Sequence, residues 1–294
     1  MGEVSVGGRT VRFEVYGSGN GPLVFLMHGT PGSRLGVRPD DATLAKLGVR
    51  VVAHDRPGYG GSDPQPGRVV ADVATDVAAI ADALDVATFA VYGISGGGPH
   101  ALACAALLPD RVTRVASLVG VAPYDAPDLD WTAGMTKSNV DEFNAAVAGD
   151  EAVTALLAPV ETAIREDPSG LLDALEPELS EPDRELLREQ WLRDMLTVSF
   201  AEAVRTGIRG WVDDDLAFVA PWGFDPSTIF APTLLWHGAD DVLAPTHHTE
   251  WLNRAIPVAH FLRPANTGHL GAFAAQGYVL SWILGDDAAP RRRS

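Results

Sequence analysis

The segment from residue 88 to residue 108 constrains the fold of this chain more than any other. Residues 88–92 are apolar, aromatic or β-branched, which is typical of a buried strand, and the run ends at Gly93. Residues 99–108 consist mostly of Ala, Leu and Cys, which predicts a helix. Ser95 therefore lies on a sharp turn between a strand and a helix, within a Gly-x-Ser-x-Gly pattern.

The two outer glycines of this pattern have a steric explanation. A serine on so sharp a turn takes a strained backbone conformation, and side chains two residues away would collide with the neighbouring strand and helix. Gly93 and Gly97 carry no such side chains. The turn would expose the Ser95 hydroxyl, and free N–H groups at the start of the helix would face the same point. The segment predicts a nucleophile beside a site that stabilises negative charge.

Strand and helix patterns alternate over the first 120 residues. Gly7 and Gly8 predict a hairpin between the first two strands. The alternation that follows predicts right-handed crossovers and a mainly parallel sheet. Strands are expected at residues 4–6, 10–16, 23–27, 49–53, 88–92 and 112–119, and helices at residues 40–47, 69–84 and 99–108.

The pattern changes after residue 121. Residues 122–225 contain helical segments, many acidic residues and several prolines, but no buried strand pattern. We therefore predict an α/β core of residues 1–121 and 226–294 with eight strands, and a helical cap inserted at residues 122–225. The cap helices are expected at residues 140–148, 151–165, 169–175, 182–196 and 200–207. In the second part of the core, strands are expected at residues 233–236 and 259–262, and helices at residues 246–256 and 270–284.

The composition narrows the classes of partner. The net charge of −17 argues against nucleic acid and against anionic membrane surfaces. No window is apolar for the length of a membrane span, and Cys104 is the only cysteine, so no intramolecular disulfide is expected. We predict a cytoplasmic protein that acts on a small molecule, with homo-oligomer formation left open. Residues 291–293, three arginines, are expected to form a solvated tail.

A serine nucleophile needs a base, and the base needs a third group that holds its tautomer. His269 lies on a glycine-containing loop directly after the last expected strand, and we predict that it is the base. Asp240 and Asp241 lie on the loop after the preceding strand, and either could be the acid. Asp125 and Asp128 are further alternatives, because they could reach the histidine from the end of the strand that precedes the cap.

A second loop is expected at the same edge of the sheet. It follows the apolar run of residues 23–27, and ligands in open α/β sheets bind beyond the carboxyl ends of the strands. The backbone N–H of Thr30 is therefore a candidate oxyanion donor, opposite the N–H of Gly96.

Five sequence motifs, named at the end of this paragraph, together resemble those of the α/β-hydrolase superfamily. The resemblance covers nearly the whole chain except the cap. The resemblance implies that Asp241 is the acid, because the acid in similar proteins is usually the third residue after the loop glycine. It also implies an oxyanion hole formed by Thr30 and Gly96, whereas the aspartate nucleophile of similar dehalogenases and epoxide hydrolases is excluded by Ser95. The motifs are His28-Gly29-Thr30-Pro31-Gly32, Asp55-Arg56-Pro57-Gly58-Tyr59-Gly60-Gly61-Ser62, Gly93-Ile94-Ser95-Gly96-Gly97, Gly238-Ala239-Asp240-Asp241 and Gly268-His269.

We expect a cofactor-independent serine hydrolase with no metal, most simply a carboxylesterase for small to medium uncharged esters that forms an acyl-enzyme. Two alternatives stay open. One is an aminopeptidase or amidase similar to proline iminopeptidases, although Thr30 and Gly96 differ from the residues usual in that group. The other is a non-catalytic small-molecule-binding member of the fold, in which Ser95 is only a turn residue. Cap residues expected to line the pocket are Trp131, Met135, Trp211 and Trp222.

Overall fold

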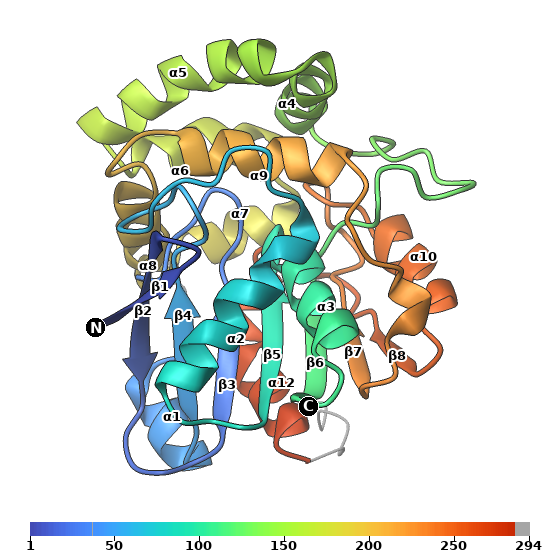
Figure 1. Cartoon of the computed structure of the whole chain (residues 1–294). Coiled ribbons are helices and arrows are strands. Elements are labelled where there is room, and N and C mark those ends of the chain that lie inside the picture. Colours follow the sequence, from blue (N-terminus) through green and yellow to red (C-terminus); the bar gives the residue numbers. More distant parts are fainter. Residues whose placement is uncertain (37, 286–294) are drawn as a thin grey trace.

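A computed structural model describes residues 1–36 and 38–285 (Figure 1), so the three arginines at residues 291–293 lie outside the described residues. The described residues form one sheet of eight strands in the order β1-β2-β4-β3-β5-β6-β7-β8. The strands are β1 (Gly2–Val6), β2 (Arg9–Tyr16), β3 (Leu23–Met27), β4 (Arg50–His54), β5 (Phe89–Ile94), β6 (Val112–Leu118), β7 (Thr233–Trp236) and β8 (Ala259–Leu262).

The sheet is parallel except at one edge. Strands β1 and β2 form an antiparallel hairpin, and β2 also pairs antiparallel with β4. From β4 through β3, β5, β6 and β7 to β8, every neighbouring pair is parallel. The predicted α/β fold with a mainly parallel eight-stranded sheet is therefore confirmed.

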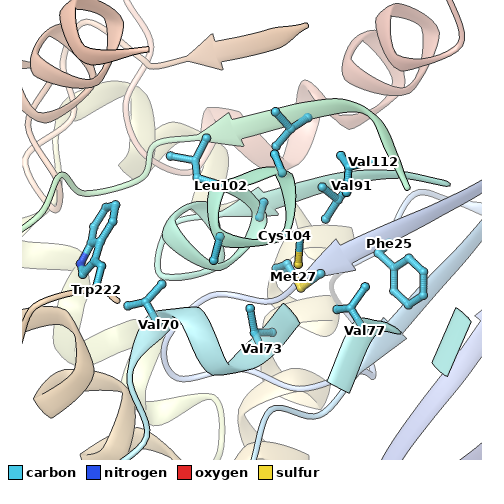
Figure 2. Packing of buried hydrophobic residues seen from close by; sticks show 14 of the residues in the cluster. Phe25, Met27, Val70, Val73, Val77, Val91, Leu102, Cys104, Val112 and Trp222 are labelled. Atoms are coloured by element: carbon cyan, nitrogen blue, oxygen red, sulfur yellow. The ribbon is translucent and has the colours of Figure 1, made fainter. Parts of the chain in front are cut away.

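Helices cover both faces of the sheet, because the central strands are apolar on both faces. All residues of β3 and β5 are buried. On one face, Cys104 of α3 (Gly97–Leu107) and Val73 of α2 (Val73–Ala83) lie toward Met27, as Figure 2 shows. On the other face, Leu44 of α1 (Asp41–Leu47) and Leu280 of α12 (Gln276–Ile283) pack against the alternate residues of the same strands.

The helices between β6 and β7, residues 137–219, cover the carboxyl ends of the parallel strands (Figure 1), and we call them the cap. Their apolar side chains form a third buried cluster, separate from the two beside the sheet. Within the described residues, no helix is long and apolar enough to cross a membrane. The cap helices are α4 (Lys137–Ala148), α5 (Asp150–Glu166), α6 (Gly170–Leu175), α7 (Glu181–Leu187), α8 (Gln190–Ala203) and α9 (Arg209–Val219). The remaining elements are α10 (His247–Ala255), α11 (Gly271–Ala274), η1 (Val70–Asp72), η2 (Glu176–Glu178) and η3 (Pro226–Thr228).

The sequence prediction was wrong for three helices. The segment predicted as one helix over 182–196 is split between α7 and α8 by a turn at Arg188 and Glu189, where no glycine or proline marks the break. The expected helix at 200–207 is the end of α8, which stops at Ala203. The expected final helix is likewise divided into α11 and α12.

Helix α9 was not predicted at all. Three of its residues, Trp211, Asp215 and Phe218, recur at helical spacing and line one cavity. The three consecutive aspartates of the segment hid this pattern, because such a run is more typical of a solvated surface than of a buried helix.

Candidate active site

Ser95 lies between the end of β5 and the start of α3, in the left-handed region of backbone conformation with φ of 55°. This is a strained conformation for a residue other than glycine. A Cβ atom at Gly93 would lie 2.0 Å from the carbonyl oxygen of Gly97, and one at Gly97 would lie 2.1 Å from that of Met27. The turn that presents Ser95 thus requires glycine on both sides of it.

Ser95 lines a cavity of about 410 Å³ between the sheet edge and the cap. Thr30, Gly96 and His269 line the same cavity, so the structure brings these four predicted residues together. Most of the remaining wall is apolar and comes from the cap. It includes Leu157, Leu172, Leu179, Leu187, Leu196 and Phe200.

The imidazole of His269 is fixed by Asp241. Nδ1 of His269 lies 2.8 Å from Oδ2 of Asp241, and both side chains are buried. The same carboxylate lies 3.0 Å from Nε2 of His237 and accepts hydrogen bonds from the backbone N–H groups of Leu243 and Ala244. A carboxylate is only an acceptor, so Nδ1 carries the proton and Nε2 is left as a base.

Asp241 and His269 shift each other's pKa values in the direction that favours the ion pair. Burial alone would raise the pKa of Asp241, but His269 and His237 lower it below its ordinary value. Burial alone would lower the pKa of His269, but the carboxylate of Asp241 raises it above its ordinary value. No hydrogen bond joins Ser95 Oγ to His269 in the described part of the chain. Catalytic hydrogen bonds of this kind often form only when substrate is bound.

The other carboxylates considered from the sequence do not reach His269. Asp240 is exposed, and its backbone N–H donates to the carbonyl of Thr267. Asp125 and Asp128 are also exposed. Of these alternatives, only Asp241 contacts the imidazole.

A second carboxylate, which the sequence did not indicate, holds the backbone of the His269 loop. Asp183 of α7 is fully buried and accepts hydrogen bonds from the N–H groups of His269 at 2.9 Å and Leu270 at 2.8 Å. Burial raises the pKa of Asp183, and the positive charge that His269 can carry opposes this shift. The spacing of Ser180 and Asp183 indicates only the start of a helix, so no sequence pattern indicates this long-range contact.

The backbone N–H groups of Thr30 and Gly96 are available to a ligand. Neither donates a hydrogen bond to any group in the described residues. The two segments are in contact, because a Cβ atom at Gly96 would lie 2.4 Å from Oγ1 of Thr30. Two free donors therefore border the cavity beside Ser95.

A buried cluster of charges lies behind this pair of donors. Asp214 of α9 accepts hydrogen bonds from Thr30 Oγ1 at 2.7 Å and Tyr59 Oη at 2.9 Å. It also forms ion pairs with Arg56 at 2.5 Å and Arg68 at 2.7 Å, with all three charged groups buried. Burial alone would raise the pKa of Asp214, but the two guanidinium groups hold it well below its ordinary range. The sequence indicated the Arg56 motif but not its partner in the cap.

Arg56 also contacts the loop itself. Its Nη1 donates to the carbonyl of His28 at 2.5 Å, and its Nη2 donates to the carbonyl of Gly29 at 2.9 Å. Arg56 and Asp214 together fix the segment that ends at Thr30.

Of the four residues of segment 122–225 that were predicted to bind substrate, only Trp211 lines the cavity. Trp131 is buried, donates to the carbonyl of Ala122 and packs edge-on against Phe143. Met135 and Trp222 pack against the cluster beside the sheet. The prediction for these three is corrected, because their large apolar side chains pack in or against the buried cluster beside the sheet.

The comparison with known families agrees with this architecture. The sequence profile of the alpha/beta hydrolase fold family matches residues 22–275, which includes β3, the Ser95 turn and the loops of Asp241 and His269. The chain belongs to the α/β-hydrolase fold family. The family resemblance indicated by the sequence motifs is therefore confirmed.

Relatives of this α/β hydrolase carry several activities. A non-heme chloroperoxidase of Streptomyces lividans is 29% identical over 250 residues, covering 83% of this chain and 84% of that protein. A pimeloyl-[acyl-carrier protein] methyl ester esterase of Nitrosomonas europaea is 27% identical over 255 residues, covering 86% and 90%. The enol-lactonase of Burkholderia xenovorans LB400 has a similar fold, with a TM-score of 0.69, 22% identity and coverage of 96% and 98%.

Proposed function

We propose that this protein is a serine hydrolase of carboxylic esters, with Ser95 as nucleophile, His269 as base and Asp241 as acid. One observation carries the proposal: Ser95, the imidazole held by Asp241, and the two free N–H groups of Thr30 and Gly96 all border one cavity. This set is what acyl transfer through a covalent intermediate requires.

In the proposed reaction, Oγ of Ser95 attacks the ester carbonyl while Nε2 of His269 takes the hydroxyl proton. The N–H groups of Thr30 and Gly96 donate hydrogen bonds to the oxyanion. The imidazolium then gives its proton to the departing alkoxide, which leaves an acyl group on Ser95. Water attacks this ester by the same route, with His269 again as base. Asp241 holds the tautomer and stabilises the imidazolium in both halves.

The cavity supports a substrate of small to medium size. Its volume of about 410 Å³ is in the range of small-molecule sites, and leucine side chains of the cap dominate its wall. Such a wall favours an apolar acyl or alcohol group. Hydrolysis of esters is also the activity named for the pimeloyl ester esterase among the relatives.

The proposal is tested with a fluorophosphonate probe and a panel of p-nitrophenyl esters of increasing chain length. We expect the probe to label the protein, and replacement Ser95→Ala to abolish labelling and lower ester turnover by about a thousandfold or more. Ser281→Ala is the matched control, because this serine lies on α12 outside the cavity lining. Near wild-type turnover in Ser95→Ala would end the proposal.

The same panel separates the alternatives. Faster cleavage of anilides and aminoacyl arylamides than of esters would favour an amidase or aminopeptidase. Absence of both labelling and turnover in the folded protein would favour a non-catalytic binding protein.

A further inference from the structure

The cavity above Ser95 contains one polar feature that the proposed reaction does not use. Glu142 of α4 and Asp215 of α9 line its wall among the leucines. Nε1 of Trp211 donates a hydrogen bond of 2.7 Å to Oε1 of Glu142. Two carboxyl groups in an apolar wall are costly unless something compensates them.

Asp215 is the buried member of this pair. It is 1% exposed, and neither of its carboxyl oxygens accepts a hydrogen bond from an N–H or hydroxyl group of the described residues. Its hydrogen-bond neighbour is the carboxyl group of Glu142. Two carboxyl groups can form such a bond only if one is protonated. Burial, and next the charge of Glu142, raise the pKa of Asp215 well above its ordinary value, so Asp215 holds the proton.

Glu142 is the more accessible member of the pair. It is half-buried, whereas Asp215 is covered, so Glu142 is the carboxyl group that a ligand in the cavity can reach. It accepts hydrogen bonds from Trp211 and, in this arrangement, from the protonated Asp215. Burial raises the pKa of Glu142 above its ordinary value, and these two bonds oppose that shift because they stabilise the carboxylate.

No basic side chain of the described residues forms an ion pair with Glu142 or Asp215. The basic side chains of the same two helices are paired elsewhere. Lys137 pairs with Asp141, and Arg209 pairs with Asp150 and Asp213. A negative charge on this pair therefore has no ion-pair partner within the described residues. A positively charged ligand group would be complementary to it.

The pair lies close to the reacting centre. Phe218 lies three residues after Asp215 in α9, and its ring borders the Ser95 turn, because a Cβ atom at Gly96 would lie 3.0 Å from Cζ of Phe218. Three residues of an α-helix advance by about 4.5 Å along its axis, so Asp215 lies about one helical turn from this ring. Glu142 and Ser95 line the same cavity, so a group held by Glu142 would share that cavity with the scissile carbonyl.

We propose that Glu142, supported by Trp211 and Asp215, binds a protonated amine of the substrate. This inference rests on the proposed ester hydrolysis and narrows it, from an uncharged ester to an ester that carries an ammonium group.

The test compares p-nitrophenyl esters that differ only in an ammonium or a methyl group at the chain end. The pairs are the β-alanine ester with the butyrate, and the ε-aminocaproate with the heptanoate. We expect the ratio of kcat/KM values, ammonium over methyl, to fall about ten- to a hundredfold in Glu142→Gln for at least one pair. The intrinsic reactivities of the esters cancel in this comparison between variants.

Asp141→Asn is the matched control. Asp141 is the adjacent carboxylate of α4, it lines the same cavity, and it is exposed and paired with Lys137. This variant should keep the wild-type ratio. Glutamine at position 142 keeps an oxygen that can accept from Trp211, so the fold should be preserved. An unchanged ratio in Glu142→Gln, or an equal loss in Asp141→Asn, would overturn the inference.

A binding experiment keeps this inference distinct from the proposed reaction. Calorimetry of Ser95→Ala should show that pentylammonium binds more tightly than pentanol, and that Glu142→Gln in the same background removes the difference. Failure of all esters to react would overturn the proposed function, and calorimetry would still decide on the amine site. Equal binding of the two ligands would overturn the amine site alone.

Discussion

Oγ1 of Thr30 donates a hydrogen bond of 2.7 Å to Oδ2 of Asp214, which joins the loop after β3 to helix α9 of the cap. The same carboxylate pairs with Arg56 and Arg68, and Arg56 donates to the carbonyl groups that precede Thr30. The segment that carries a proposed oxyanion donor is thus held from the cap as well as from the core.

Replacing Asp214 should therefore destabilise the protein strongly. In Asp214→Ala, the guanidinium groups of Arg56 and Arg68 would stay buried without their shared partner, which costs about 3–5 kcal/mol of the free energy of unfolding. Urea unfolding followed by circular dichroism measures this loss. Asp150→Ala is the control, because Asp150 is 53% exposed in its pair with Arg209, and its loss should cost less than about 1 kcal/mol. Equal losses would contradict the central place of Asp214.

The pH profile of ester hydrolysis should follow the protonation of His269. The base must be neutral to accept the proton of Ser95, so kcat/KM falls as the pH drops through the pKa of His269. Asp241 raises that pKa above the ordinary value of 6.5, so the midpoint of the acidic limb should lie above 6.5. In Asp241→Asn, the midpoint should move to lower pH and turnover should fall by about a thousandfold or more. A midpoint that stays in place would show that another group limits activity.

Replacing Asp183 should lower turnover, although its carboxylate contacts the His269 loop only at the backbone. Its carboxylate holds the N–H groups of His269 and Leu270, so Asp183→Ala should let the loop move and lower kcat by about ten- to a hundredfold. KM should change little, because Asp183 is not among the residues that line the cavity. Glu185→Ala, an exposed position on the same helix, is the control. A larger change in KM than in kcat would instead indicate a role in binding.

The glycines of the Ser95 turn should not tolerate alanine. In Gly97→Ala, the added methyl group would lie 2.1 Å from a backbone oxygen of β3, which cannot move without disturbing the sheet. We expect a large drop in melting temperature or no soluble protein. Gly277→Ala in α12 is the control, since its Cβ atom would meet only a methyl group of Thr43 at 3.7 Å. This change should be neutral, or stabilising by up to about 1 kcal/mol. A similar result for both would refute the steric explanation.

The strand ends were predictable from sequence because each carries a local signal. A buried strand leaves an apolar run, and the loops that hold Ser95 and Asp241 follow such runs directly. Strand β8, which precedes the His269 loop, is short and only partly buried. These loops lie close together in space because a parallel sheet brings the carboxyl ends of its strands to one edge.

The contributions of the cap were not predictable in the same way. Asp183 and Asp214 act across 86 and 158 residues of sequence, on the His269 loop and on Arg56 respectively. No local pattern distinguishes them from the many exposed acidic residues of the same region. For Trp131 and Trp222 the error was the reverse. Their size predicted a role in the pocket, but their packing stabilises the core.

Helix α9 presents two neighbouring aspartates to different surroundings, Asp214 to the arginines of the core and Asp215 to the cavity. If the cap of another protein replaced this one, Arg56 and Arg68 would consequently stay buried without a partner, unless the new cap supplied an acid at the position of Asp214. Substrate selectivity can instead vary through substitutions at Asp215 and its partner Glu142, although the adjacent Asp214 must be kept. Recombination among relatives would thus be restricted to caps whose electrostatics match the arginines beneath them.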